Sequence, residues 1–346
     1  MRKPRLRALV LSAGYGTRLR PLTLLLPKPL LPVCGEPVAG TTIRSLRAVG
    51  CEVAVLNTHY LHGQIPAALG ASYFGLPLRY SHEPEIQGTF GALFAPRDLL
   101  SRCDAVIVVN GDSLCRWPLK AMIRRHFGTG ADATLLLHRE PPQDALGGGI
   151  AVDGNRRVVQ LRDYPGRGEV HRRHLFAGVQ ILSPRLLERI ENRPGDVISD
   201  LYQPLLEEGG RISSVVTAER WHDLGTPGRY LTACLDWARG RLPLRFWNGD
   251  VCSPLATVDS TATVRRSIVE QEARVGERAT IQESLVMPGA VVGKGCTVRS
   301  GIVGPGVVLP ASSSVEGRMI SRFDKAHKLG PGESVMGELV YTPLGS

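Results

Sequence analysis

The 346-residue sequence predicts an α/β fold, a doubly wound and mostly parallel sheet, followed by a short parallel β-helix. Short apolar runs alternate with amphipathic segments over residues 5–240, which is typical of the strands and helices of a parallel sheet. From Ala256 onward apolar residues recur every 17 residues, a period that suits one coil of a β-helix. We therefore expect a domain over 1–240, a linker over 241–255, about four coils over 256–320 and a tail over 321–346.

The first predicted strand, Ala8–Leu11, runs into a turn at Ser12–Gly16 that contains Gly14 and Gly16. Glycine lets the backbone adopt positive φ and pass close to a ligand. The backbone N–H groups of such a turn form a concave site for anions. A glycine pair after a strand is by itself a weak sign of nucleotide binding, so the residues that follow it decide its meaning.

A cationic loop follows this turn. Arg18 offers a planar group that matches phosphate oxygens, and Lys28 lies between two proline residues. Four prolines disfavour a helix and predict a stiff, extended segment: Pro21, Pro27, Pro29 and Pro32. The stretch therefore predicts a phosphate-binding loop with two cations directed into it.

The other elements of the domain alternate along the chain. Residues 41–49 carry apolar side chains at helical spacing and end before Gly50, and Asp153–Asn155 predicts the tight turn of a hairpin between 150–152 and 158–161. Further strands are expected at 53–56, 78–80, 105–109, 133–137 and 176–182. Further helices are expected at 61–69, 88–100, 119–127, 184–190, 196–207 and 227–238.

The C-terminal repeat consists of several apolar series with one period. One series is Val258, Val275, Val292 and Leu309. Another series, six residues further on, is Val264, Ile281, Val298 and Val315. Glycine residues at 276, 289, 293 and 295 disfavour α-helix in this region. The pattern predicts a coil with three short faces.

Composition excludes several classes of protein. The formal charge is +10, but only six of the 42 basic residues are lysine and no basic run contains interleaved aromatic residues, so we expect no nucleic acid as partner. Anionic small molecules suit the charge equally well. No apolar run is long enough to span a membrane or to form a secretory signal. The seven cysteine residues are scattered without metal-ligand spacing, which favours a reducing cytoplasm and no structural zinc.

Two carboxylates follow predicted strands. Asp112 ends the apolar run Val106–Val109, and Asp223 lies in a Trp-His-Asp-Leu-Gly-Thr-Pro segment that precedes a predicted helix. Ligands of such sheets bind at the carboxyl ends of the strands, and Mg²⁺ commonly takes one or two protein carboxylates. From local context alone, Asp112 could equally be a turn residue and Asp223 a helix cap, with no role in metal binding.

The whole string from Gly14 to Leu30, Gly-x-Gly-Thr-Arg-Leu-x-Pro-Leu-Thr-x4-Pro-Lys-Pro-Leu, resembles the signature of the sugar-nucleotide pyrophosphorylases. These sugar-1-phosphate nucleotidyltransferases join an NTP to a sugar 1-phosphate and release pyrophosphate. The resemblance implies a Rossmann-like sheet, a left-handed β-helix, and Mg²⁺ held by Asp112 and Asp223. It covers about residues 6–320.

Further segments carry the resemblance into the predicted site. Glu83–Gly91 is similar to the segment that faces the base, and Gly147–Gly149 and Phe176–Val179 are similar to segments beside the sugar. The resemblance implies these nucleotide-binding residues: Ala13, Gly14, Gly16, Thr17, Arg18, Glu83, Gly88 and Asp112. It implies a sugar-phosphate site at Lys28, Gly149, Gly178 and Asp223. The catalytic residues would be Arg18, Lys28 and Asp112.

One position departs from the family pattern. Tyr164 stands where many members carry a lysine for the sugar phosphate, and a tyrosine supplies no cation. Arg162, Arg167 or Arg172 are the possible replacements.

The Asn57–Tyr60 segment, Asn-Thr-His-Tyr, is most similar to the mannose-1-phosphate guanylyltransferase branch, which makes GDP-mannose from GTP and mannose 1-phosphate. Uridylyl or thymidylyl transfer, for instance to glucose 1-phosphate, and a non-catalytic regulatory subunit of the same fold are the alternatives. An acetylating β-helix is excluded, because no histidine lies between His222 and His327 to act as a base. The exposed faces and ends of the β-helix predict a homo-oligomer.

Overall fold

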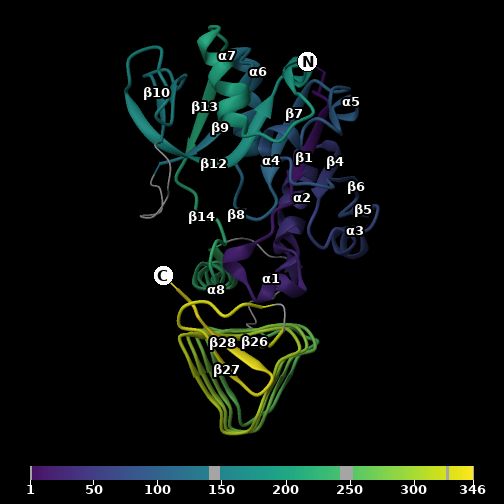
Figure 1. Cartoon of the computed structure of the whole chain (residues 1–346), viewed down its shortest axis with the longest axis vertical. Helices are drawn as coiled ribbons and strands as arrows, with labels where there is room; N and C mark the ends of the chain where they lie inside the picture. The colour runs from purple at the N-terminus through teal and green to yellow at the C-terminus, as the bar shows by residue number, and fades with distance from the viewer. Residues whose placement is uncertain (1, 140–148, 242–251, 325–326, 346) are drawn as a thin grey trace. The chain divides into compact units, whose positions relative to one another are not determined.

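The computed structural model describes residues 2–139, 149–241, 252–324 and 327–345 (Figure 1). Contacts group the chain into two compact units. One contains Met1–Gly14 and Ala39–Trp221, and the other contains Tyr15–Val38 and His222–Ser346. Most of the expected linker at 241–255 lies outside the described residues, and the division into domains at that point stays a prediction.

The first unit is built on one ten-stranded sheet. Its centre is parallel, in the order β7-β1-β4-β6, as the alternating pattern predicts. These strands are β1 Leu6–Leu11, β4 Cys51–Thr58, β6 Leu76–His82 and β7 Ala105–Asn110. The interior of β7 is an unbroken apolar run because both faces of the strand are covered. The doubly wound, mostly parallel sheet is thus confirmed.

The other half of the sheet is mixed. The long strand β12 (Arg172–Leu182) lies antiparallel to β7 on one side and to β9 (Ala133–His138) on the other. Strand β13 (Ile212–Thr217) runs parallel to β9, and β10 (Ile150–Val152) forms the predicted hairpin with β11 (Val158–Leu161). A two-residue strand, β5 (Ser72–Tyr73), pairs antiparallel with β6 at the far edge.

Two helices of this unit are two residues longer than predicted, 38–48 against 41–49 and 119–129 against 119–127, and the others are shorter. They are α2 Val38–Ala48, α3 Gln64–Leu69, α4 Gly88–Gly91, α5 Arg97–Leu100, α6 Leu119–Thr129 and α7 Gln203–Glu207. The single helix predicted over 88–100 is wrong, because Pro96 interrupts the pattern and two short helices, α4 and α5, form instead. The helix predicted over 196–207 begins as a π-helical turn at Ile198–Tyr202 and continues as α7.

The loop after the glycine turn is also more helical than predicted. It contains the 3₁₀ turns Thr17–Leu19 and Lys28–Leu30 and a single α-turn, α1 Leu22–Leu25. The prolines are compatible with these turns because they stand at or before the first helical positions, where no N–H bond is lost. Strands β2 (Pro32–Val33) and β3 (Glu36–Pro37) then form a tight hairpin.

The β-helix of the second unit confirms the 17-residue repeat. Thr257 pairs with Arg274, which pairs with Val291, which pairs with Val308. Three parallel sheets of this kind form the three faces, and Figure 1 shows the coils stacked as a triangular prism. The strands of the first face are β15 Thr257–Val258, β18 Arg274–Val275, β21 Val291–Val292 and β24 Val308–Leu309. Those of the second are β16 Thr263–Arg265, β19 Thr280–Gln282, β22 Thr297–Arg299 and β25 Ser314–Glu316. Those of the third are β17 Ile268–Val269, β20 Leu285–Val286, β23 Ile302–Val303 and β26 Arg318–Arg322.

The tail folds back on this third face. Strand β28 (Leu339–Pro343) pairs antiparallel with β26, and β27 (Ser334–Met336) pairs with β28. The carbonyl of Leu344 then accepts a hydrogen bond of 2.8 Å from the backbone N–H of Gly228, in the first turn of α8 (Pro227–Asp236). The end of the described chain is therefore tied to the helix that follows Asp223.

A buried carboxylate marks the packing between the β-helix and the loop of the second unit. Glu270 follows β17 and is fully buried. It lies beside the Cys34–Gly35 turn. Burial raises the pKa of Glu270 to about 7, against the opposite effect of the backbone N–H groups of Gly35 and Cys34. Burial also raises the pKa values of the neighbouring Cys34, Cys234 and Tyr230, so these groups are neutral at pH 7.

Glu270→Gln is expected to remove a pH dependence of stability. Because the folded-state pKa is raised, the stabilisation is fully present below about pH 4.5, the unfolded pKa, and is lost as the pH rises to about 7. This difference corresponds to roughly 3 kcal/mol, so the variant should be more stable than the wild type by that order at pH 8 and equal to it at pH 4. Denaturant unfolding at several pH values measures it. Glu272→Gln, which removes an exposed carboxylate from the same coil, is the control, and parallel pH profiles for both variants would contradict the expectation.

Candidate active site

Strands β1 and β7 bring two predicted site segments to one edge of the first unit. Leu11 pairs with Asn110, and the Gly111 N–H donates to the Leu11 carbonyl at 2.8 Å. The turn after β1 and the carboxylate of Asp112 after β7 therefore leave the sheet side by side. Ala13 is buried, Asp112 is half-buried, and the position of a side chain at Gly14 is open space, with nothing within 4 Å.

A chain of buried hydrogen bonds links this turn to the segment predicted to face the base. The Ser12 N–H donates to Asn57 Oδ1 at 2.7 Å, and Asn57 Nδ2 donates to Glu83 Oε1 at 2.8 Å. The other carboxylate oxygen of Glu83 accepts from the Gln87 N–H at 2.9 Å. Glu83 is only 4 % exposed. The geometry therefore gives Glu83 a positioning role between two loops, and it assigns Asn57 to the site, which sequence reasoning did not.

Gly88 has no side chain because another backbone segment passes beside it. Its φ is +68°, and a Cβ there would lie 2.3 Å from the carbonyl oxygen of Gly195. The Phe90 N–H donates to that same carbonyl at 3.0 Å. The base-side segment is thus held in place through Gly195, and Gly88 stays a proposed ligand contact. Gly149 and Gly178 lie against His174 and Asn110, respectively, at the start of β10 and within β12.

The second unit gathers the predicted cations around Asp223. Lys28 is 8 % exposed, and its Nζ donates to the Asp223 carbonyl at 2.8 Å. The guanidinium of Arg18 lies over Gly225, where a Cβ would be 3.1 Å from Arg18 Nη1. Arg229 Nη1 forms a 2.7 Å ion pair with Asp223 Oδ2. Three cations therefore meet one short segment, and Arg229, six residues after Asp223, is the one that sequence reasoning missed.

Local turns fix this cluster. Gly16 has φ of 62° and precedes the 3₁₀ turn that begins at Thr17, and its carbonyl accepts from Thr23 Oγ1 at 2.8 Å. At the other segment, the Gly225 N–H donates to Asp223 Oδ1 at 3.2 Å, and Thr226 caps α8 by accepting from the Arg229 N–H. The Asp-Leu-Gly-Thr-Pro sequence thus builds a turn followed by a capped helix.

Asp112 and Asp223 are each chemically suited to a magnesium ion. Among the described residues no group of three or more His, Cys, Asp or Glu side chains is placed to hold a metal. Mg²⁺ requires fewer protein ligands than that, because it keeps water and substrate phosphate oxygens in its shell. Asp112 and Asp223 each offer a half-exposed carboxylate, and each oxygen of Asp223 has one recorded hydrogen-bonding or ionic partner and a second lone pair.

Tyr164 and the three arginines that could replace the family's lysine have different surroundings. The Tyr164 ring packs against the core of the first unit, and Arg162 forms an ion pair with Asp196 at 3.4 Å. Arg167 and Arg172 line surface cavities. Gly147 and Gly148 lie outside the described residues.

Two family models match most of the chain. Residues 7–239 match the family model described as "Nucleotidyl transferase", and residues 251–319 match "GlmU-like, C-terminal hexapeptide". Among the helices of the described residues, every one is too short or too polar to cross a lipid bilayer.

Several relatives cover most of the chain. It is 29 % identical to the mannose-1-phosphate guanylyltransferase catalytic subunit beta of Danio rerio over 265 residues, which are 75 % of this chain and 73 % of that protein. It is 30 % identical to the probable mannose-1-phosphate guanylyltransferase 2 of Arabidopsis thaliana over 269 residues, with the same coverage. The solved structure of HddC from Yersinia pseudotuberculosis has a TM-score of 0.56 at 22 % identity, over 67 % of this chain and 99 % of that one, and so shows a shared fold.

Proposed function

The chain belongs to the nucleotidyl transferase family, and on that premise we propose that it transfers a nucleoside monophosphate from an NTP to a sugar 1-phosphate and releases pyrophosphate. The observation that carries the proposal is the cluster of Lys28, Arg18 and Arg229 around Asp223. The reaction brings two phosphate anions together, so it requires cations that are already in place more than it requires a covalent nucleophile.

The proposed mechanism is an in-line attack by a phosphate oxygen of the sugar 1-phosphate on the α-phosphorus of the NTP. The backbone turn at Ala13–Gly16 and the hydroxyl of Thr17 would bind the triphosphate, with the Arg18 guanidinium on the departing β- and γ-phosphates. Lys28 would place its charge where the two reacting phosphates meet. Asp112 and Asp223 would hold Mg²⁺, which when bound offsets phosphate charge.

The backbone of Gly149 and Gly178 would lie against the sugar, and that of Gly88 against the base or ribose. We propose GTP and mannose 1-phosphate as the substrates and GDP-mannose as the product. The Asn-Thr-His-Tyr segment at Asn57–Tyr60 and the names of the relatives support this choice. A uridylyl or thymidylyl transferase, and a non-catalytic subunit of the same fold, are the alternatives.

A screen of pyrophosphate release tests the proposal. Four NTPs are each combined with a panel of sugar 1-phosphates, with and without Mg²⁺. We expect the highest kcat/KM with GTP and mannose 1-phosphate, and no release without Mg²⁺. Greater activity with UTP or dTTP would favour uridylyl or thymidylyl transfer over guanylyl transfer. No release of pyrophosphate with any pair would favour the non-catalytic alternative.

We further propose a cytoplasmic protein that self-associates through its β-helix. All seven cysteines are free thiols, which suits a reducing compartment. Exposed apolar side chains on the second unit, among them Val308 at 56 % and Met336 at 70 % exposure, suit a contact between copies. Sedimentation of the intact chain gives its assembly state, and a monomer at all concentrations would contradict the proposal.

A further inference from the structure

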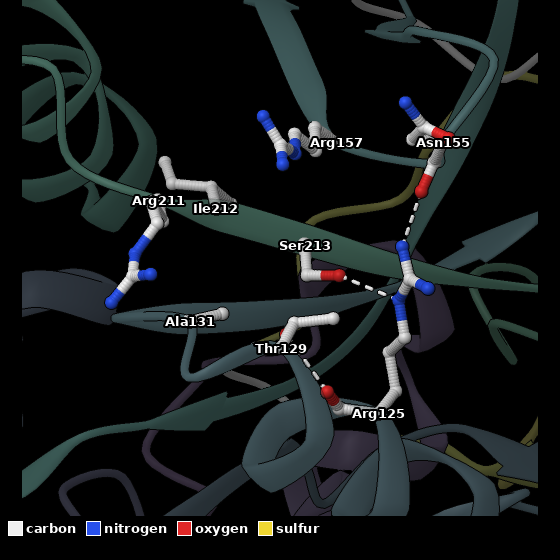
Figure 2. Close-up of a pocket in the computed structure, with 8 residues that line it drawn as sticks. All are labelled: Arg125, Thr129, Ala131, Asn155, Arg157, Arg211, Ile212 and Ser213. Atoms are coloured by element: carbon white, nitrogen blue, oxygen red, sulfur yellow. Dashed lines mark hydrogen bonds between the residues drawn. The ribbon is translucent and has the colours of Figure 1, made fainter.

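A second group of cations lies in the first unit, and none of its members is among the residues assigned to the reaction. It surrounds a cavity of about 340 Å³ between the end of α6, the turn that joins β10 to β11, and the start of β13. Figure 2 shows the lining side chains: Arg125, Arg157 and Arg211 carry the charge, and Thr129, Asn155 and Ser213 are polar and neutral. Among the residues that the structure describes, no carboxylate lines this cavity.

No carboxylate of the described residues pairs with any of the three guanidinium groups. Arg125 Nε donates to Ser213 Oγ at 2.8 Å, and its Nη2 donates to the Asn155 carbonyl. These neutral acceptors orient the group without cancelling its charge. No side-chain hydrogen bond or ion pair is recorded for Arg157 or Arg211 in the described part of the chain.

The nearby carboxylates are already engaged. Asp132 pairs with Arg185, and its other oxygen accepts from the Arg211 backbone N–H at 2.8 Å. Asp153 Oδ1 accepts from the backbone N–H groups of Asn155 and Arg157, at 2.9 and 2.8 Å, and so closes the hairpin turn. Asp153 and Glu169 line the adjoining cavity of about 510 Å³, which shares Arg157 and Arg211, and neither is among the residues that line the first cavity.

The high arginine content of the chain does not account for this arrangement. Other arginines of the same unit pair with carboxylates, as Arg5 does with Asp104 and Arg193 does with Asp200. Three unneutralised cations at one concave site repel one another, and a bound anion relieves that repulsion. Guanidinium groups also match phosphate oxygens in geometry.

We propose that this cavity binds a small anion with two or more phosphate groups, separately from the phosphates of the reacting substrates. The hydroxyls of Ser213 and Thr129 add hydrogen-bonding capacity, and a volume of this size suits a small ligand. The proposal goes beyond the proposed function and does not depend on it. The inorganic probe is pyrophosphate, with inorganic phosphate as the comparison of lower charge.

Arginine modification of the intact protein tests the site residue by residue. Phenylglyoxal labelling is measured by peptide mass spectrometry with and without pyrophosphate. We expect labelling of Arg125, Arg157 and Arg211 to fall at least threefold, and labelling of Arg124 to stay unchanged. Arg124 is the internal control because it is exposed on α6 beside Arg125 but does not line the cavity. Equal labelling with and without pyrophosphate, or equal protection by phosphate, would overturn the proposal.

A double variant, Arg157→Gln with Arg211→Gln, gives the second measurement. Both side chains are exposed, so the fold should be retained, which circular dichroism checks. In this variant, the pyrophosphate concentration needed to protect Arg125 from labelling should rise at least tenfold. The concentration needed to protect Arg18, in the predicted active loop, should not change. Arg124→Gln is the matched variant and should alter neither value. Unchanged protection of Arg125 in the double variant would show that the three arginines do not form one site.

Discussion

Asp112→Asn is expected to abolish most turnover while leaving the fold intact. The change removes a charge that the proposed Mg²⁺ needs, and an ion in this role stabilises a transition state by several kcal/mol, so kcat should fall roughly 10²–10⁴-fold. The fold should persist because the side chain lies half-exposed after β7 and Asn has nearly the same shape. Pyrophosphate release at saturating Mg²⁺ measures the loss, and Asp223→Asn should behave similarly.

The control variant is Asp104→Asn, at the other end of β7. Asp104 lies just before β7, is partly exposed and pairs with Arg5 at 3.2 Å, so Asp104→Asn removes an equal charge at the opposite end of the strand. A surface ion pair of this kind contributes little to stability, and this variant should keep normal turnover. Near wild-type rates for both Asp112→Asn and Asp223→Asn would contradict the proposal that these two residues hold Mg²⁺.

Local patterns were sufficient for most of the architecture. The 17-residue repeat predicts the register of the β-helix directly, because each coil places residues i and i+17 opposite each other. The parallel centre of the sheet follows from alternating strands and helices. The antiparallel placement of β12 between β7 and β9 was not predicted, since periodicity identifies a strand but carries no information on its neighbours or direction.

The residues of the candidate site also divide into those marked by local sequence features and those brought together only by the fold. Arg18, Lys28, Asp112 and Asp223 are marked by turns and by strand ends, which are local features. Asn57 was missed as a site residue because its role depends on reaching Ser12 and Glu83 from another strand. The arginine cavity was missed for the same reason, because its three cations come from α6, a hairpin turn and β13, which only the fold brings together.

The compact units also could not be predicted from sequence order. Contacts group the loop at Tyr15–Val38 with the β-helix and α8, although about 200 residues separate them in sequence. Tyr230 Oη donates to the Pro32 carbonyl at 2.5 Å, and Lys28 Nζ reaches Asp223 at 2.8 Å. The change of pattern at Ala256 shows where the repeat begins, but it does not show which earlier segment packs with the repeat.

Lys28→Met is expected to lower kcat by about 10²–10³-fold, the loss typical of one preorganised electrostatic contact, with a smaller effect on KM. The Lys28 ammonium is held by the Asp223 carbonyl at 2.8 Å on a segment that is almost fully buried, so it is in place before reaction. Negative charge concentrates at the α-phosphate as the acceptor closes in. The Lys28 ammonium should therefore stabilise the transition state more than the ground state.

Arg18→Met should give the contrasting result. The Arg18 guanidinium is exposed over Gly225 and is proposed to bind the part of the NTP that leaves as pyrophosphate, a contact that exists before reaction. Its loss should raise KM for NTP in one direction and for pyrophosphate in the other. Arg20→Met, which removes an exposed cation two residues further along the same loop, is the matched control and should change neither constant.

Steady-state kinetics in both directions separates the possible roles of Lys28. One possibility is that Lys28 only positions Asp223 by its hydrogen bond to the Asp223 carbonyl. Excess Mg²⁺ should then restore much of the activity of Lys28→Met, because a higher metal concentration compensates for a displaced metal ligand. If Lys28 acts on the reacting phosphates, Mg²⁺ should restore little, because the missing positive charge at the α-phosphate is not replaced. A melting temperature close to that of the wild type ensures that folded protein is compared, and an unchanged kcat would show that Lys28 has no part in the reaction.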